Sequence, residues 1–184
     1  MTDKLNISFD EFTRYVSKII RDITVSNWRP DYIVGITRGG LMPAVMLSHY
    51  FNVPMHTLDV SFRDNQTGTG PVSNLWMSDD AFGYVPDPES SVRSSDAYRK
   101  NILIVDDIND QGTTLNWIIE DWQSNCLPDN EGWETVWNRN VRFAVVVDNL
   151  ASNCKVKMDY VGLEINKAEN DVWINFPYEN FWIK

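Results

Sequence analysis

The chain has 184 residues, of which 43% are hydrophobic and 12% aromatic, so it is long enough to bury a core of ordinary size. Its formal net charge of −10 argues against a nucleic-acid-binding protein, which needs a basic surface. No run approaches about 20 apolar residues, and the first residues lack the apolar segment of a signal peptide. Cys126 and Cys154 have neither metal-type spacing nor partners for a disulfide framework. We therefore expect one cytoplasmic domain over residues 1–184, without a membrane span.

A helix is expected from Ser8 to about Thr24, because Ser8 and Glu11 have the spacing of a capping box and apolar residues follow at helical intervals. A strand at 32–36 and a helix at 41–50 follow. The loop between them holds Arg38, Gly39 and Gly40. The glycines let the backbone approach a ligand closely, and the arginine offers a planar fork of donors that suits phosphate oxygens. This loop is a candidate phosphate site.

A further strand is expected within residues 53–62. Residues 63–100 form a long polar stretch with three prolines and a serine-rich patch, which is typical of a lid or an inserted segment. Within it, the aromatic residues of 76–84 could pack under such a lid or against a second subunit. A second polar insertion is expected at about 123–140.

The strongest pattern begins at Ile102–Val105. These four apolar residues, three of them β-branched, predict a strand buried on both faces of a parallel sheet. Asp106, Asp107 and Asp110 follow, and Gly112–Thr114 lead into a helical pattern. A glycine–threonine loop at a helix N-terminus suits a phosphate, while carboxylates at a strand end can hold sugar hydroxyls or Mg²⁺. The pattern predicts a phosphorylated-sugar site; the alternative is an ordinary strand-to-helix turn with a capping residue.

Two more strands are expected at 141–147 and 158–164. Asp148 and Asn149 follow the first of them. Ligands of open α/β sheets bind outside the carboxyl ends of the strands, so these residues can line a site or form an ordinary turn. Trp173, in the segment 171–179, has a ring that can stack on a nucleobase, although core packing is the default interpretation of a tryptophan.

The string at 102–114, four hydrophobic residues and then D-D-x-x-D-x-G-T-T, closely resembles the phosphoribosyl-pyrophosphate (PRPP) signature of type I phosphoribosyltransferases. The resemblance implies an α/β fold, with a Rossmann-like parallel sheet flanked by helices, a mobile lid loop from about residue 63 and a C-terminal base-binding segment. It implies that Asp106 and Asp107 face the ribose hydroxyls and Mg²⁺, and that Asp110 is the general base or charge stabiliser. Gln111 and Thr113 stand where the family often has threonine and glycine. The implied PRPP-binding residues are Arg38, Gly39, Gly40, Arg63, Asp106, Asp107, Ile108, Asn109, Asp110, Gln111, Gly112, Thr113 and Thr114.

Two other blocks carry the resemblance. The R-G-G loop resembles the pyrophosphate loop of 6-oxopurine phosphoribosyltransferases, which often contains a cis peptide before a residue other than proline. The string D-x-W-I-x-x-P-Y-E at 171–179 resembles the base-binding segment of the bacterial xanthine-guanine enzymes. The implied base-binding residues are Asp110, Asp148, Asn149, Trp173 and Ile174.

One departure concerns the base itself. The xanthine-guanine enzymes place a lysine just past the strand that begins here at Val141, and that lysine donates to the purine 6-oxo group. This chain has Asp148 and Asn149 there, and an ionised carboxylate cannot donate a hydrogen bond. The sequence therefore leaves the base open, with an exocyclic amine or a base read through Asn149 as alternatives.

We expect a pentosyltransferase that transfers the 5-phosphoribosyl group from PRPP to a nucleobase, with a purine favoured, and forms a nucleoside monophosphate and pyrophosphate in salvage. Mg²⁺ is the expected cofactor, and the resemblance implies a homo-oligomer, either a dimer or a tetramer. The alternatives are a catalytically silent PRPP-binding regulator and a pyrimidine phosphoribosyltransferase.

Overall fold

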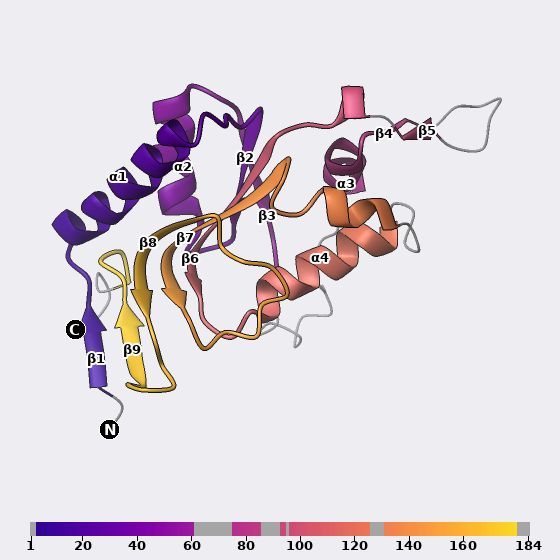
Figure 1. The fold of residues 1–184 in the computed structure, drawn as a ribbon. Helices are drawn as coiled ribbons and strands as arrows, with labels where there is room; N and C mark the ends of the chain where they lie inside the picture. The colour runs from indigo at the N-terminus through magenta and orange to yellow at the C-terminus, as the bar shows by residue number, and fades with distance from the viewer. Residues whose placement is uncertain (1–2, 61–74, 86–92, 95, 126–130, 180–184) are drawn as a thin grey trace.

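A five-stranded parallel sheet forms the centre of the protein (Figure 1). The computed structural model describes residues 3–60, 75–85, 93–94, 96–125 and 131–179. Every pair of neighbouring strands in the sheet is parallel, which confirms the predicted fold class. In spatial order the strands are β3 (Met55–Leu58), β2 (Tyr32–Ile36), β6 (Ile102–Asn109), β7 (Val141–Asn149) and β8 (Tyr160–Ile165).

Helices cover both faces of this sheet (Figure 1). One face packs against α1 (Phe9–Val25) and α2 (Leu41–Phe51), and the other against α3 (Leu75–Phe82), α4 (Thr113–Asn125) and the 3₁₀ helix η2 (Glu131–Thr135). The capping box at Ser8 and Glu11 is present, as the sequence predicted. A short antiparallel pair, β4 (Tyr84–Val85) and β5 (Arg93–Ser94), and the 3₁₀ helix η1 (Asp96–Tyr98) complete this side.

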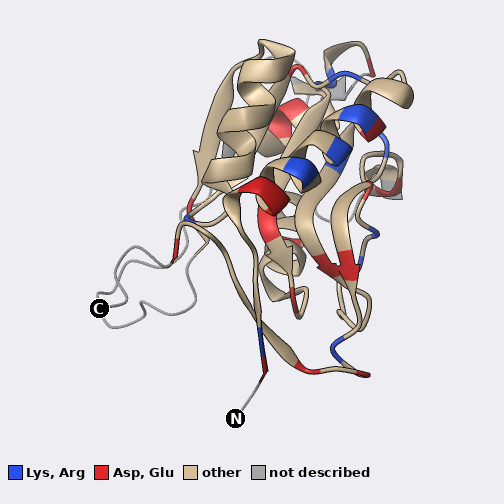
Figure 2. Ribbon diagram, turned by 90° about the vertical axis from the view of Figure 1, so that its left-hand side faces the viewer, with Lys and Arg blue, Asp and Glu red and all other residues tan. Residues whose placement is uncertain are grey.

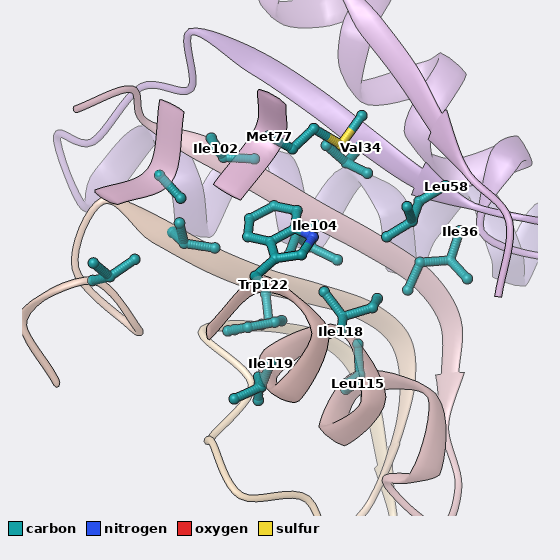
Figure 3. Close-up of a cluster of buried hydrophobic side chains, with 14 of the residues drawn as sticks. Val34, Ile36, Leu58, Met77, Ile102, Ile104, Leu115, Ile118, Ile119 and Trp122 are labelled. Carbon is teal, nitrogen blue, oxygen red and sulfur yellow. The ribbon is translucent and has the colours of Figure 1, made fainter. Parts of the chain in front are cut away.

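The unbroken apolar run of β6 contributes side chains to the cores on both faces of the sheet. Successive side chains of a strand point to opposite sides, so Ile102 and Ile104 join the core under α4, while Leu103 and Val105 join the core under α1 and α2. On the α4 side, Trp122 lies against the sheet (Figure 3). A central strand covered on both faces needs apolar residues at every position, which explains the pattern seen in the sequence.

The segments that read as insertions contribute to the same core where the structure describes them. Helix α3 buries Met77, Ala81 and Phe82, so part of the aromatic stretch 76–84 is core. In η2, Trp133 is buried and stacks on Trp137, with ring centroids 5.2 Å apart. These segments are polar on average, so their composition did not indicate the few apolar side chains that cover the sheet on the α4 side.

A second, two-stranded parallel sheet joins the two ends of the chain. It pairs β1 (Asp3–Asn6) with β9 (Val172–Asn175), and Lys4 lies opposite Trp173. The sequence analysis identified no strand at the N-terminus. This small sheet lies at the end of the molecule toward which β6, β7 and β8 run (Figure 1). Among the residues that the structure describes, no helix is long and apolar enough to span a membrane.

Trp122 should be a major source of stability because it is fully buried between α4 and the sheet. We expect Trp122→Ala to lower the free energy of unfolding by about 3–5 kcal/mol, since it removes a large apolar side chain and leaves a cavity. Trp76→Ala is the matched control, because Trp76 is 44% exposed and its loss should cost less than half as much. Urea unfolding monitored by circular dichroism measures both; equal losses would contradict the packing described here.

Candidate active site

The acidic pair lies inside a strand. Strand β6 continues past its apolar run to Asn109, and β7 extends beside it to Asn149, so Asp106 pairs with Val145 in the ladder. Both aspartates are partly exposed. Figure 2 shows acidic residues in red at the ends of neighbouring strands. Extended pairing holds the two carboxylates on a rigid element rather than on a flexible turn.

The environment of this pair favours the neutral carboxyl forms. Burial, and then the neighbouring charge of Asp107, raises the pKa of Asp106 well above its usual range. Burial also raises the pKa of Asp107, although a 2.7 Å hydrogen bond from the Tyr178 hydroxyl to Asp107 Oδ2 opposes that shift. The Asp107 amide donates to Asp106 Oδ1 at 2.9 Å. In turn, burial and the Asp107 charge raise the pKa of Tyr178, so Tyr178 stays a hydrogen-bond donor.

The Arg38 loop lies directly against these carboxylates. A Cβ atom added to Gly39 would fall 1.8 Å from Asp107 Oδ2, and one added to Gly40 would fall 2.4 Å from the carbonyl oxygen of Val105. At Gly40 the obstacle is backbone, so that position requires glycine, whereas a side chain at position 39 would displace the Asp107 carboxyl group. The Thr37–Arg38 peptide bond is cis, which answers a question that the sequence left open. Arg38 itself is exposed at the rim of the site.

The predicted phosphate loop has its expected position between β6 and α4. Gly112 has a φ of +82°, and a Cβ there would lie 2.5 Å from the Cys154 amide nitrogen, so this position also requires glycine. The segment after β7 supports the loop, because the Asn153 amide donates to the carbonyl of Gln111 at 3.3 Å. The side chain of Asn116, in the first turns of α4, donates to the carbonyl of Asn153 at 3.0 Å. Thr113 and Thr114 open α4, where the helix N-terminus favours an anion.

The acidic pair fits a magnesium ion. Carboxylate oxygens are hard ligands, and Mg²⁺ in phosphate-transfer sites is commonly held by one or two carboxylates together with substrate phosphates. Burial raises the pKa of both Asp106 and Asp107, so their charged forms are poorly stabilised by the protein alone, and a bound cation would favour those forms. No group of three or more histidine, cysteine or acidic residues that could hold a metal occurs in the described part of the chain. Two neighbouring carboxylates suit an ion whose other ligands come from substrate phosphates and water.

Asp110 has a partner that the sequence analysis did not identify. Its Oδ1 lies 2.9 Å from Nζ of Lys167, a residue in the connection between β8 and β9. Buried Asn149 ties the two backbones together: its Nδ2 donates to the Asp110 carbonyl at 2.8 Å, and its Oδ1 accepts from the Lys167 amide at 3.0 Å. Asp148 accepts a 2.8 Å hydrogen bond from the side chain of Asn109. The residues predicted to read a base therefore hold protein groups in place.

The other predicted base-binding residues lie on β9. Trp173 is 51% exposed, whereas Ile174 is buried in the core under α1. Because neighbouring residues of a strand point to opposite faces, Trp173 presents its ring to solvent while Ile174 anchors the strand. Arg63 and the lid predicted to begin there lie outside the described residues.

Two contributors were missed at the level of sequence. Tyr178 belongs to the string at 171–179 that resembles a base-binding segment, so the sequence indicated that this part of the chain was functional. It did not predict the contact of Tyr178 with Asp107. Lys167 had no such signal, because it is far from Asp110 in the chain and lies in no recognisable motif.

This arrangement of two loops around an acidic strand end agrees with the comparison against known families. The family described as phosphoribosyl transferase domain matches residues 2–182. The chain belongs to this family. Its assignment to the pentosyltransferases and its type I fold, both predicted from the sequence, are thereby confirmed.

Individual relatives agree at low identity. The chain is 24% identical over 173 residues to a hypoxanthine-guanine phosphoribosyltransferase of Schizosaccharomyces pombe, a match that covers 84% of this chain and 79% of the relative. It is 25% identical to xanthine phosphoribosyltransferase 1 of Saccharomyces cerevisiae over 65% of this chain, and the match spans 60% of that relative's length. A purine phosphoribosyltransferase from Pyrococcus horikoshii shares the fold, with a TM-score of 0.62, 24% identity and coverage of 100% and 99% of the two chains.

Replacement of Asp106 by asparagine should stabilise the protein at neutral pH. A carboxyl whose pKa is raised on folding contributes stability below its unfolded pKa and loses it as the pH rises through the folded value. Asp106→Asn removes the group whose ionisation lowers stability at neutral pH. The Oδ1 atom of the new asparagine can still accept the hydrogen bond from the Asp107 amide. In metal-free buffer we expect a higher melting temperature than wild type at pH 7.5 and a smaller difference at pH 4.5. Exposed Asp171→Asn is the control; equal shifts in both variants would contradict this account.

Asn149 should matter for stability because one buried side chain serves several backbone groups. We expect Asn149→Ala to lower the free energy of unfolding by about 1–3 kcal/mol, since it leaves buried backbone groups without partners. Exposed Asn170→Ala should change it by less than about 0.5 kcal/mol. Chemical denaturation curves of the two variants check this, and similar losses in both would refute the role given to Asn149.

Proposed function

We propose that this protein transfers the 5-phosphoribosyl group of PRPP to a purine base and releases pyrophosphate, as a cytoplasmic, Mg²⁺-dependent homo-oligomeric enzyme of purine salvage. The observation that carries the proposal is the contact of Gly39 with Asp107, which brings the Arg38 loop against the acidic strand end. The phosphate loop opens α4 at the same edge of the sheet. The named activities of the relatives support a purine as the acceptor.

PRPP has three kinds of polar group, and the site offers a matching element for each. Arg38 and the amides of Gly39 and Gly40 suit the pyrophosphate, because a guanidinium fork and exposed N–H groups bind phosphate oxygens. Asp106 and Asp107 suit the ribose hydroxyls and the metal. The Asp110–Thr114 loop suits the 5′-phosphate at the N-terminus of α4. Mg²⁺, when bound, supplies positive charge that stabilises the departing pyrophosphate.

In the reaction, the bond between ribose C1′ and the pyrophosphate oxygen breaks and a bond from C1′ to a base nitrogen forms. Positive charge develops on the ribose ring, so carboxylates beneath it stabilise the transition state. The base nitrogen loses its proton, and Asp110 is the proposed acceptor. The exposed ring of Trp173 provides a flat apolar surface on which a purine can stack.

A catalytically silent PRPP-binding regulator is the second candidate. It is favoured by the side chains of Asp148 and Asn149, which are engaged with Asn109, Asp110 and Lys167 rather than presented as donors to a base. Such a protein would bind PRPP and Mg²⁺ through the same loops without turnover.

Pyrophosphate release from PRPP and Mg²⁺ should be measured with guanine, xanthine, hypoxanthine, adenine, uracil and orotate. We expect turnover with at least one purine. Asp110→Asn should then lower kcat with the preferred base by about 10²- to 10⁴-fold, the range of general acid–base catalysis. Asp10→Asn, at an exposed position in the first turn of α1, should leave kcat unchanged. PRPP binding without turnover of any base would favour the regulator, and unchanged kcat in Asp110→Asn would remove that residue from the mechanism.

A further inference from the structure

Lys167 forms an ion pair with Asp110 of the candidate site, although no sequence motif marks it. Its side chain is 15% exposed, whereas that of Asp110, its partner at 2.9 Å, is 42% exposed. Lysine side chains are rarely this buried unless their charge is paired. The pair therefore sits at the boundary between the protein and the open side of the site, with the carboxylate as its more accessible member.

The position of Lys167 is fixed by backbone contacts. Its amide donates to Oδ1 of Asn149 at 3.0 Å, and Nδ2 of the same asparagine donates to the carbonyl of Asp110 at 2.8 Å. One buried side chain thus sets the distance between the two backbones that present the pair. A residue with several rotatable bonds gains a defined location in this way, as recognition of a small planar ligand requires.

The pair combines one acceptor with one donor. A carboxylate accepts hydrogen bonds, whereas an ammonium group has three N–H donors, of which the contact with Asp110 engages one. A base edge that matches such a pair has an N–H next to a carbonyl oxygen. The N7 and O6 edge of hypoxanthine, guanine and xanthine has this pattern. Adenine has an amino group in place of O6, and an ammonium group cannot accept a hydrogen bond from it.

The other polar residues at the end of β7 do not provide that donor. Asp148 is an acceptor when ionised, and its carboxylate accepts from Asn109. The Asn149 amide bonds to the backbone of Asp110, Ala151 and Lys167. Lys155, from the connection after β7, pairs instead with Glu120 on α4 at 2.5 Å.

We infer that Lys167 reads the 6-oxo group of the base and makes the site selective for 6-oxopurines over 6-aminopurines. The inference rests on the proposed function, because it concerns the base that accepts the phosphoribosyl group. It places the donor on the β8–β9 connection rather than at the end of β7.

The test compares kcat/KM for hypoxanthine and adenine at saturating PRPP and Mg²⁺ in wild type, Lys167→Met and Lys167→Gln. We expect wild type to prefer hypoxanthine. Lys167→Met should lower kcat/KM for hypoxanthine by about 10- to 100-fold, as expected for a lost hydrogen bond to a charged group, and should leave adenine little changed. Lys167→Gln should also lower the ratio of kcat/KM for hypoxanthine to that for adenine, because the glutamine amide oxygen can accept a hydrogen bond from the 6-amino group of adenine. If Lys167→Met does not fold, the comparison of Lys167→Gln with wild type still tests the inference.

Lys155→Met is the matched control, since it removes a lysine that is 55% exposed and paired with Glu120 rather than with Asp110. It should leave the hypoxanthine-to-adenine ratio as in wild type. An unchanged ratio in both Lys167 variants would overturn the inference and reduce the ion pair to a structural role, even with the proposed function intact. A wild-type preference for adenine would overturn it as well.

Calorimetric binding of inosine and adenosine 5′-monophosphates separates this inference from the proposed function. If wild type turned over no base, the proposed function would fall, and binding alone would decide the role of Lys167. Tighter binding of inosine monophosphate in wild type, lost in the Lys167 variants, would still support it. Equal binding of the two nucleotides by wild type would refute it.

Discussion

Two carboxylates held side by side and partly buried near the end of β6 are the constraint on which the site depends. Burial raises the pKa of both Asp106 and Asp107, so the folded chain alone stabilises their charge poorly. Two hydrogen bonds partly offset this cost. The Tyr178 hydroxyl donates to Asp107, and the Asp107 amide donates to Asp106. Such an arrangement costs stability in the free protein and suits a ligand that brings cations and hydroxyl groups to it, a common trade between stability and function.

The closeness of that pair to the Arg38 loop dictates other parts of the sequence. Asp107 occupies the space that a side chain at Gly39 would need, and the backbone of β6 occupies the space at Gly40. Tyr178 then reaches Asp107 from the segment after β9, which pairs with the N-terminal strand β1. The Tyr178 hydroxyl thus links the segment after β9 to the acidic end of β6. Three stretches that are distant in sequence meet there because the parallel sheet brings its carboxyl ends together.

How far the sequence predicted this structure depended on how local each signal was. The apolar run at 102–105, the capping box at Ser8 and the glycine loops are local patterns, and they predicted the parallel sheet, α1 and the two loops correctly. Strand β1 has four exposed residues, and its pairing with β9 is a long-range choice that no local pattern reveals. The buried side chains of α3 and η2 were hidden by polar neighbours, and the pair of Lys167 with Asp110 depends on a fold-level contact.

If Lys167 reads the base as proposed above, a residue missing from a motif does not mean that its function is missing. The xanthine-guanine enzymes that the sequence resembles place a lysine after the strand that begins at Val141, whereas this chain has Asp148 and the amide of Asn149 there. That amide connects the backbones of Asp110 and Lys167. A lysine in the β8–β9 connection, such as Lys167, can place its ammonium group close to the end of β7, because adjacent parallel strands end at the same edge of the sheet. Recognition depends on where the donor atom lies, so sequence position alone does not determine which base the site accepts.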